Sequence, residues 1–262
     1  MPVIIHPSAV VDPTARLGAD VHVGPFCIVG PDVELGDRVR LVSHAVVEGR
    51  TTIGSGTVIY PFASIGHPPQ DKKYKGEPSE LVIGADNTIR EHVTMNPGTE
   101  GGGMVTRVGD RGWFMMGAHI AHDCQVGNDV IMANHATLAG HVIVGDHAIL
   151  GGLCAVLQFV RIGAHAMIGG LAGVEADVIP FGMVKGDRAY LAGLNLVGLE
   201  RRGFQRTEVN ALRAAYKTVF GQENTMAERI QEAVETFPQS TLVTDLVSFL
   251  TERSSRPLTL PR

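Results

Sequence analysis

Residues 118–150 read AHIAHDCQVGNDVIMANHATLAGHVIVGDHAIL, and every sixth residue of this stretch is apolar. The series consists of Ile120, Val126, Met132, Leu138, Val144 and Leu150. A period of six fits neither the 3.6-residue period of an amphipathic helix nor the alternation of a conventional strand. It is typical of hexapeptide repeats, whose short strands and tight corners wind into a parallel β-helix.

The same period covers most of the first 180 residues. One run extends from Ile5 to Ile65, a short run contains Ile83, Ile89 and Met95, and a third extends from Val108 to Val174. Three hexads make one triangular coil, and successive coils stack at a strand spacing of about 4.7–4.9 Å. Because a coil buries its apolar face only against its neighbours, several coils are needed for a stable fold.

Two insertions interrupt the period. The first, residues 67–80 (HPPQDKKYKGEPSE), is polar, charged and rich in proline, so we expect it to project from the coil as a loop. Long loops on rigid scaffolds often carry function. The second, around residues 97–106, contains GTEGGG and predicts a shorter excursion, in which the glycines relieve steric limits on the backbone.

After Pro180 the six-residue period stops and helical patterns follow. We expect one helix from Thr207, a second after the capping-box pair Thr225 and Glu228, and a third over residues 242–253. The sequence therefore predicts a mainly β protein, with a β-helix domain over residues 1–190 and a helical domain over 191–262. A helical cap would end the open coil and block edge-to-edge pairing.

Composition and charge narrow the function classes. The chain has 262 residues, a net charge of −5 and 44% hydrophobic residues, as expected for an ordinary globular protein, and this charge argues against nucleic acid as the main partner. We expect no membrane span, no signal peptide and a cytoplasmic location. Cys27, Cys124 and Cys154 all occupy the small position of the repeat and are expected to be buried thiols.

Histidines concentrate in the middle of the coil. His122 and His141 are nineteen residues apart, so both can face the same side on adjacent coils, and His119 precedes His122 by three positions. A single corner histidine more often fills an exposed turn than carries a function. A stacked set is more informative, because a histidine that titrates near neutrality can remove the proton from a hydroxyl group.

Acyltransferases are one known class of hexapeptide β-helix, and two other classes of function remain open at this point. Hexapeptide β-helices include zinc-dependent carbonic anhydrases, and His119, His122 and His141 could supply three imidazole ligands, although those enzymes have no counterpart to the long helical C-terminus. A catalytically silent scaffold is the other alternative. Metal analysis of the purified protein distinguishes the hydratase from an acyltransferase. Substitution of His122 distinguishes an acyltransferase from the scaffold, because only the enzyme would lose activity.

Several segments together resemble the UDP-N-acetylglucosamine O-acyltransferases, which catalyse the first step of lipid A biosynthesis. The segments are GPFCIVGP (24–31), YPFASIG (60–66), QDKKYKGEP (70–78), AHIAHDCQVGN (118–128), ATLAGHV (136–142), GLERRGF (198–204) and AYK (215–217). The resemblance covers almost the whole chain. It implies a left-handed parallel β-helix with a helical C-terminal domain, assembled as a homotrimer with active sites between subunits.

The resemblance also implies roles for particular residues. His122 would be the general base for the glucosamine 3-hydroxyl, Asp123 would orient its imidazole, and the Gly140 N–H would stabilise the oxyanion. The acyl donor would be acyl carrier protein bearing a 3-hydroxyacyl chain, and the acceptor would be UDP-N-acetylglucosamine or its 3-amino analogue. Transfer would be direct, with no cofactor, no metal and no covalent acyl-enzyme.

Further contacts follow from the same resemblance. The expected substrate-binding residues are Asp71, Lys73, His119, His141, Gln158, Asn195, Arg201 and Arg202. Gly170 would lie in the acyl-chain pocket and leave room for a fairly long chain. The acidic carrier protein would dock on a basic patch of Arg201, Arg202, Arg206, Arg213 and Lys217.

The chain departs from the family pattern at three positions. Asn96 and Leu157 stand where relatives carry histidine, and Val197 stands where they carry glutamate. None of these side chains titrates, so charged contacts at those positions are absent. The N-acyltransferases of the same pathway carry an additional N-terminal uridine-binding domain, which we do not expect here, since the repeats begin at residue 5.

Overall fold

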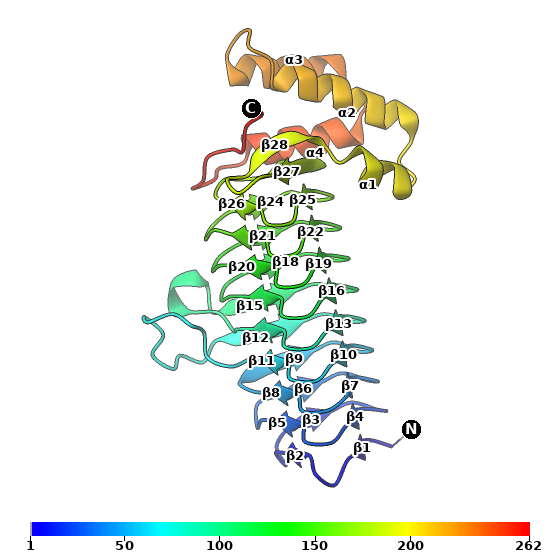
Figure 1. Ribbon diagram of the computed structural model, residues 1–262, viewed down its shortest axis with the longest axis vertical. Coiled ribbons are helices and arrows are strands. Elements are labelled where there is room, and N and C mark those ends of the chain that lie inside the picture. The colour runs from blue at the N-terminus through cyan, green and yellow to red at the C-terminus, as the bar shows by residue number, and fades with distance from the viewer. Residues whose placement is uncertain (1) are drawn as a thin grey trace.

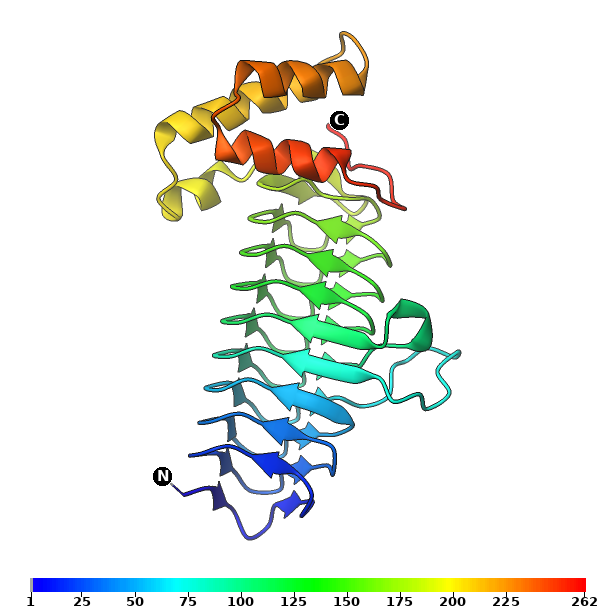
Figure 2. The same ribbon diagram turned by 180° about the vertical axis from the view of Figure 1, so that it is seen from behind.

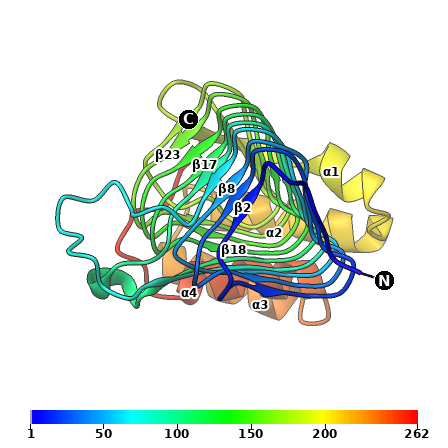
Figure 3. The same ribbon diagram turned by 90° about the horizontal axis from the view of Figure 1, so that it is seen from below.

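The computed structural model describes residues 2–262, which form a left-handed parallel β-helix capped by helices (Figure 1). Figure 3 shows the triangular cross-section, in which the chain turns anticlockwise as it recedes from the N-terminal end. Within the described residues the strands form three sheets of 11, 9 and 8 strands. The predicted mainly β architecture with a helical C-terminus is confirmed.

Each turn of the coil contributes one short strand to each sheet. Sheet 1 contains β1 (Ile4–Ile5), β4 (His22–Val23), β7 (Arg40–Leu41), β10 (Val58–Ile59), β13 (Thr88–Ile89), β16 (Trp113–Phe114), β19 (Ile131–Met132), β22 (Ile149–Leu150), β25 (Met167–Ile168), β27 (Gly182–Lys185) and β28 (Tyr190–Leu194). Sheet 2 contains β2 (Val10–Val11), β5 (Ile28–Val29), β8 (Val46–Val47), β11 (Ser64–Ile65), β14 (Thr94–Met95), β17 (His119–Ile120), β20 (Thr137–Leu138), β23 (Ala155–Val156) and β26 (Gly173–Val174). Sheet 3 contains β3 (Arg16–Leu17), β6 (Glu34–Leu35), β9 (Arg50–Ile53), β12 (Glu80–Ile83), β15 (Val105–Val108), β18 (Gln125–Val126), β21 (Ile143–Val144) and β24 (Arg161–Ile162).

The apolar position of every hexad points into the coil. Ile120 pairs with Leu138, and Leu138 pairs with Val156, so the core is a ladder of aliphatic side chains. All three of these residues are buried. Burial of one such side chain stabilises the fold by about 1.5–3 kcal/mol, which is why the ladder must continue through many coils.

Three edges separate the sheets, and each is a column of corner residues. Edge 1/2 (between sheets 1 and 2) includes Phe26, Phe62, His135, Leu153 and Leu171; edge 2/3 includes Asp123, His141 and Phe159; edge 3/1 includes Asp129, His147, His165 and Phe181. All of these residues have positive φ values, between 55° and 64°. A non-glycine residue in this left-handed region is strained by about 1–2 kcal/mol, so stacking between successive corners must offset the strain.

Both insertions leave the coil at edge 2/3. The first follows β11 and the second follows β14, where it forms the short 3-10 helix η1 (Glu100–Gly102). Figures 2 and 3 show the two loops side by side at one corner of the triangle. The two inserted loops therefore lie together beside edge 2/3.

A helix that the sequence pattern does not indicate precedes the expected ones. The antiparallel hairpin of β27 and β28 ends the coil, and α1 (Leu196–Arg201) follows it directly. The expected helices are present as α2 (Arg206–Val219), α3 (Met226–Thr236) and α4 (Thr241–Thr251), and α3 begins with the predicted capping box of Thr225 and Glu228. None of the helices in residues 2–262 has the length and apolar character needed to span a bilayer.

Candidate active site

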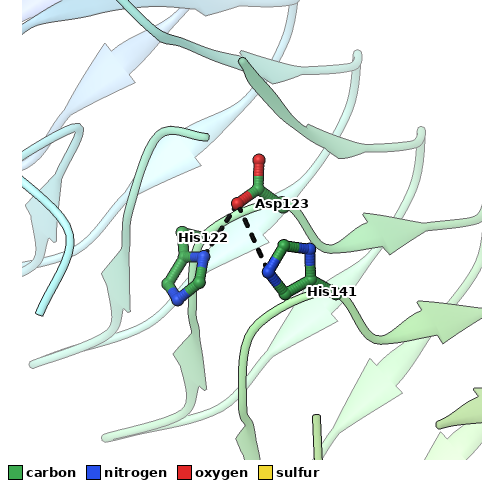
Figure 4. Close-up of side chains that lie close together, drawn as sticks. All are labelled: His122, Asp123 and His141. Carbon is green, nitrogen blue, oxygen red and sulfur yellow. Dashed lines mark hydrogen bonds and ion pairs between the residues drawn. The ribbon is translucent and has the colours of Figure 1, made fainter. Parts of the chain in front are cut away.

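His122 and Asp123 form a hydrogen-bonded pair on edge 2/3 (Figure 4). Nδ1 of His122 lies 2.8 Å from Oδ2 of Asp123. Adjacent residues of a strand point to opposite faces, but Asp123 turns the backbone with a φ of 60°, so both side chains point to the same side. The tight corner of the hexapeptide coil thus makes a catalytic-type pair from consecutive residues.

The second insertion holds the Asp123 carboxylate. Thr99 donates to it twice, from its backbone N–H (2.9 Å to Oδ1) and from its hydroxyl (2.6 Å to Oδ2). The Asp123 side chain is fully buried. Its oxygens therefore accept hydrogen bonds from three donors, and bonds to an ionised acceptor are among the stronger ones in proteins.

The glycines of this insertion have a specific use beyond backbone freedom. A Cβ at Gly102 would collide with the Asp123 carboxylate, and one at Gly98 would meet the backbone of Met104 and Val105. The loop can therefore approach Asp123 closely only with glycine at these places. Sequence reasoning missed Thr99 because its contact depends on the path of this loop, which has no period.

His141 and Phe159 continue the column above the pair. The rings of His122 and His141 meet edge-on, with centroids 5.1 Å apart, and Nε2 of His141 lies 3.9 Å from Oδ2 of Asp123. Phe159 stacks on His141 at 4.3 Å with an interplanar angle of 9°. Burial lowers the pKa of His141, and the charge of Asp123 partly opposes that shift.

Gly140 lies against the imidazole of His122. A Cβ at this position would be 2.5 Å from Cε1 of His122, which is far inside van der Waals contact. Among residues 2–262 no acceptor takes a hydrogen bond from the Gly140 N–H. The arrangement leaves a free N–H donor beside the ring.

The first insertion forms the outer wall of a groove beside these residues. The groove has a volume of about 660 Å³ and is lined by Asp71, Lys73, Lys75, Glu77, Thr99, Glu100, Gly101, His141 and Phe159. Oδ2 of Asp71 lies 4.0 Å from Nε2 of His122. Asp71 and Lys73 are thus brought to the site as the sequence predicts, together with Phe159, which sequence reasoning did not single out.

His119 lies on the outward face of sheet 2, below the pair. Its Nδ1 is 2.7 Å from the Thr94 hydroxyl. Burial lowers the pKa of His119, and the nearby His122 adds to the effect. A neutral His119 in this place can donate or accept a hydrogen bond without adding charge to the site.

Four predicted site residues lie at other edges of the same chain. Asn195 caps α1 through its side chain and donates to the carbonyl of His165, and Arg202 donates to the carbonyl of His147 at 2.8 Å. Both contacts are at edge 3/1, and exposed Arg201 ends α1 near by. Gly170 is on edge 1/2, beside Gly152. Figure 3 shows α1 and the inserted loops at different corners.

The other positions singled out from the sequence differ in burial and in their contacts. Gln158 is exposed and directly precedes Phe159. Asn96 is buried beneath the first insertion, where its side-chain amide donates to the carbonyl of His67 at 3.0 Å. Leu157 and Val197 are exposed, the latter on α1. Asn96 therefore anchors the loop instead of carrying a charge.

Three of these groups could in principle hold a metal ion. Ligand atoms of His122, Asp123 and His141 lie within 4.8 Å of one another. However, Nδ1 of His122 is hydrogen-bonded to Asp123, whose carboxylate also accepts the Thr99 hydroxyl. Because both oxygens of Asp123 already accept hydrogen bonds, from Thr99 and His122, this carboxylate would have to exchange those bonds for a metal ion, so the arrangement fits a hydrogen-bonded catalytic pair better than a zinc site.

Family models match two parts of the chain. A model described as bacterial transferase hexapeptide (six repeats) matches residues 14–49. A second, described as UDP-N-acetylglucosamine O-acyltransferase, domain 2, matches residues 177–259. The two matches correspond to the coil and to the helical cap.

Whole-chain comparisons give the same family. Proteins named acyl-[acyl-carrier-protein]–UDP-N-acetylglucosamine O-acyltransferase are 56% identical in Azorhizobium caulinodans, over 97% of this chain and 96% of that protein, and 54% identical in Caulobacter vibrioides, over 98% of both. The solved structure of the Acinetobacter baumannii member is 38% identical, with a TM-score of 0.91 over 98% of this chain and 99% of that one. The chain is an acyltransferase and belongs to the UDP-N-acetylglucosamine O-acyltransferase family.

Proposed function

We propose that this protein transfers a 3-hydroxyacyl chain from acyl carrier protein to the 3-position of the glucosamine of UDP-N-acetylglucosamine. The names of the relatives support the donor and acceptor classes. The observation that carries the proposal is the His122–Asp123 pair, which stands beside a groove walled by the first insertion. The 3-amino sugar nucleotide remains the alternative acceptor.

The hydrogen bonds around Asp123 support a general-base role for His122. Because Thr99 donates its hydroxyl proton to Asp123, the carboxylate acts as an acceptor, and Nδ1 of His122 must supply the proton of the 2.8 Å bond. Nε2 then carries the lone pair. It can remove the proton from the sugar hydroxyl, while Asp123 stabilises the resulting imidazolium.

The remaining steps follow from this protonation state. The sugar oxygen attacks the thioester carbonyl, and the Gly140 N–H stabilises the oxyanion of the tetrahedral intermediate. Collapse of the intermediate breaks the carbon–sulfur bond and releases the carrier thiolate. His122 returns its proton to that sulfur, which restores the neutral imidazole.

The distribution of the expected contacts supports a trimer with sites between subunits. In one chain His122 is at edge 2/3, whereas Asn195 and Arg202 are at edge 3/1. These edges can form one site only when edge 2/3 of one subunit faces edge 3/1 of its neighbour. A threefold arrangement with edge 1/2 at its centre brings them together.

The outward-facing residues favour the same arrangement. Sheet 3 carries charged side chains such as Arg16, Glu34 and Arg107, as a solvent face does. Edge 1/2 instead exposes apolar side chains, namely Phe26, Phe62, Leu153 and Leu171, and the adjacent face of sheet 1 exposes Trp113. Clusters of exposed apolar residues mark association surfaces. Sedimentation or light scattering should give three times the chain mass.

The docking of acyl carrier protein on the helical domain is part of the proposal. Arg206, Arg213 and Lys217 are exposed on α2, and Arg201 is exposed at the end of α1. Arg202 is partly buried against edge 3/1, which leaves four basic residues for the patch. Charge reversal of Arg206 and Arg213 should raise the KM for carrier protein; an unchanged KM would count against this surface.

Two measurements test the reaction itself. Purified protein is given a mixture of 3-hydroxyacyl carrier proteins with both the 3-hydroxy and 3-amino sugar nucleotides, and the products are identified by mass spectrometry. We expect an ester product from the 3-hydroxy sugar. In the second measurement, His122→Ala should lose activity by about 10²–10⁴-fold, the usual contribution of a general base. Acyl transfer at the wild-type rate in this variant would refute the mechanism.

A zinc hydratase is the second candidate, favoured only by the proximity of His122, Asp123 and His141. The two functions respond differently to metal removal. Dialysis against a strong chelator should leave acyl transfer unchanged, and CO₂ hydration should stay at the uncatalysed rate with or without added zinc. A zinc-dependent activity would favour the hydratase.

A further inference from the structure

The C-terminal segment returns to the edge that carries the candidate site. After α4, residues 254–262 leave the helices and run along the coil on the side of the inserted loops (Figures 1 and 2). The N–H of Asp177 donates to the carbonyl of Pro257, and the N–H of Thr259 donates back to Asp177, both at 2.8 Å. The segment therefore pairs with the coil that lies above Phe159.

Arg256 of this segment makes one directed contact with the column of edge 2/3. Its Nε donates to the carbonyl of Gln158 at 2.8 Å. Gln158 precedes Phe159, whose ring lies flat on His141 and whose N–H donates to the carbonyl of Gly140 at 3.2 Å. A short chain of contacts thus joins Arg256 to the imidazole beside Asp123.

Phe159 has ring stacking on one side only. It has a φ of 63°, in the strained left-handed region, and the residue is 47% exposed. On edge 3/1, His165 has stacked rings both below and above it, His147 and Phe181. Among the ring contacts of residues 2–262, Phe159 has one only on its lower side, to His141. Phe159 is therefore the last ring of its column.

We infer that Arg256 is a positioning residue that holds the Gln158–Phe159 corner so that Phe159 stays stacked on His141 in the groove. A charge-assisted bond from a guanidinium to a backbone carbonyl is directional and restricts the corner at the point where stacking support ends. The inference deepens the proposed function, on which its kinetic test rests. Its first test is independent of any activity.

The first test follows the His141 imidazole by NMR titration. His141 faces Asp123, His122, Asp71 and Lys73, and burial is the largest cause of its lowered pKa. In Arg256→Ala the loosened ring of Phe159 should hydrate His141 and raise the pKa of this histidine toward its ordinary value. Phe159→Ala should produce the same upward shift directly. Arg253→Ala removes an exposed arginine that directly precedes this segment and should leave the titration unchanged.

The second test is a double-mutant cycle on kcat/KM. Arg256→Ala should lower kcat/KM by roughly tenfold, which corresponds to the loss of one charge-assisted hydrogen bond. Arg256→Lys keeps a cationic donor and should recover part of the loss. If Arg256 acts through the corner, adding Arg256→Ala to Phe159→Ala should cause little further loss.

Each outcome bears on the inference in a defined way. A His141 titration that shifts in Phe159→Ala but not in Arg256→Ala overturns it, as do fully additive losses in the cycle. Thermal unfolding of each variant identifies any general loss of structure, and Arg256→Lys serves if the alanine variant does not fold. If wild-type protein shows no acyl transfer, the proposed function fails while the NMR result still decides the role of Arg256.

Discussion

The imidazole of His122 and the carboxylate of Asp123 meet at 2.8 Å although the two residues are consecutive in the chain. The left-handed corner at Asp123 makes this possible, and Thr99 from the second insertion holds the carboxylate from the other side. The pair is thus defined by one corner of the coil and one loop, and Nε2 of His122 faces Asp71 of the first insertion at 4.0 Å.

We expect catalysis to require glycine at position 140, because any side chain there would contact His122. The Cβ of a Gly140→Ala variant would press on the His122 ring, so we expect kcat to fall by about 10²-fold while the fold is retained. Gly152→Ala is the matched control, because the Cβ at that corner would be 3.4 Å from its nearest neighbour, the carbonyl oxygen of Asn134. Steady-state kinetics and circular dichroism measure both variants; equal activity in the two would contradict the assignment.

Thr99 should contribute to catalysis through Asp123. Thr99→Val removes the hydroxyl that donates to Oδ2 at 2.6 Å, and a lost hydrogen bond to a charged group predicts a decrease in kcat/KM of roughly tenfold or more. Thr99→Ser keeps the donor and should retain most of the activity. A valine variant as active as the serine variant would show that the backbone N–H of Thr99 suffices.

His165 should make stability depend on pH. Burial, with His147 and Arg202 near by, lowers the pKa of His165 to about 4. Above its ordinary pKa of about 6.5 the residue is neutral in both the folded and the unfolded state, so its titration does not change the free energy of unfolding. As the pH falls from there toward 4, the unfolded chain gains a proton that the folded chain excludes, so stability falls.

The effect can be measured as a difference between variants. Allowing for partial exposure, we expect His165 to account for about 1–2 kcal/mol of the free energy of unfolding lost between pH 7 and pH 5. Urea unfolding at constant protein concentration should show a smaller loss in His165→Phe than in wild type. The exposed His135→Phe serves as the control, and equal losses in all three proteins would argue against the assignment.

Gly170 should leave room for a long acyl chain. A Cβ at Gly170 would be 3.3 Å from its nearest neighbour, the carbonyl oxygen of Gly152, and the residue is exposed beside Leu171. A larger side chain requires only a small shift of that carbonyl and then extends into the space outside edge 1/2. Gly170→Met should shift product formation from a donor mixture toward shorter acyl chains, as read by mass spectrometry. An unchanged chain-length distribution would remove Gly170 from the pocket.

The sequence predicts the coil well because the six-residue period reflects a single physical requirement, the stacking of one apolar side chain on the next. The pairing of Ile131 with Ile149 shows the expected eighteen-residue spacing. The hairpin of β27 and β28 and the helix α1 were missed. Their apolar residues follow neither six-residue nor clear helical spacing, and α1 is only 6 residues long.

The candidate site was partly predictable for a similar reason. His122 and His141 are related by the repeat, so their spacing places them on one edge. Asp71 and Lys73 reach the groove from an insertion whose composition indicates a projecting loop. Thr99 and Arg256 make contacts that depend on the paths of aperiodic segments, which residue spacing does not encode.

The insertions affect how this edge of the β-helix can change in evolution. Ile131 pairs with Ile149 across eighteen residues, but Val58 pairs with Thr88 across thirty, and the strands on either side remain in register. Extra residues inserted at a corner thus leave the strand register of the next coil unchanged. A lineage can lengthen, shorten or exchange the loops beside His122 while the ladder behind them is inherited intact, so new substrate contacts can arise without a new fold.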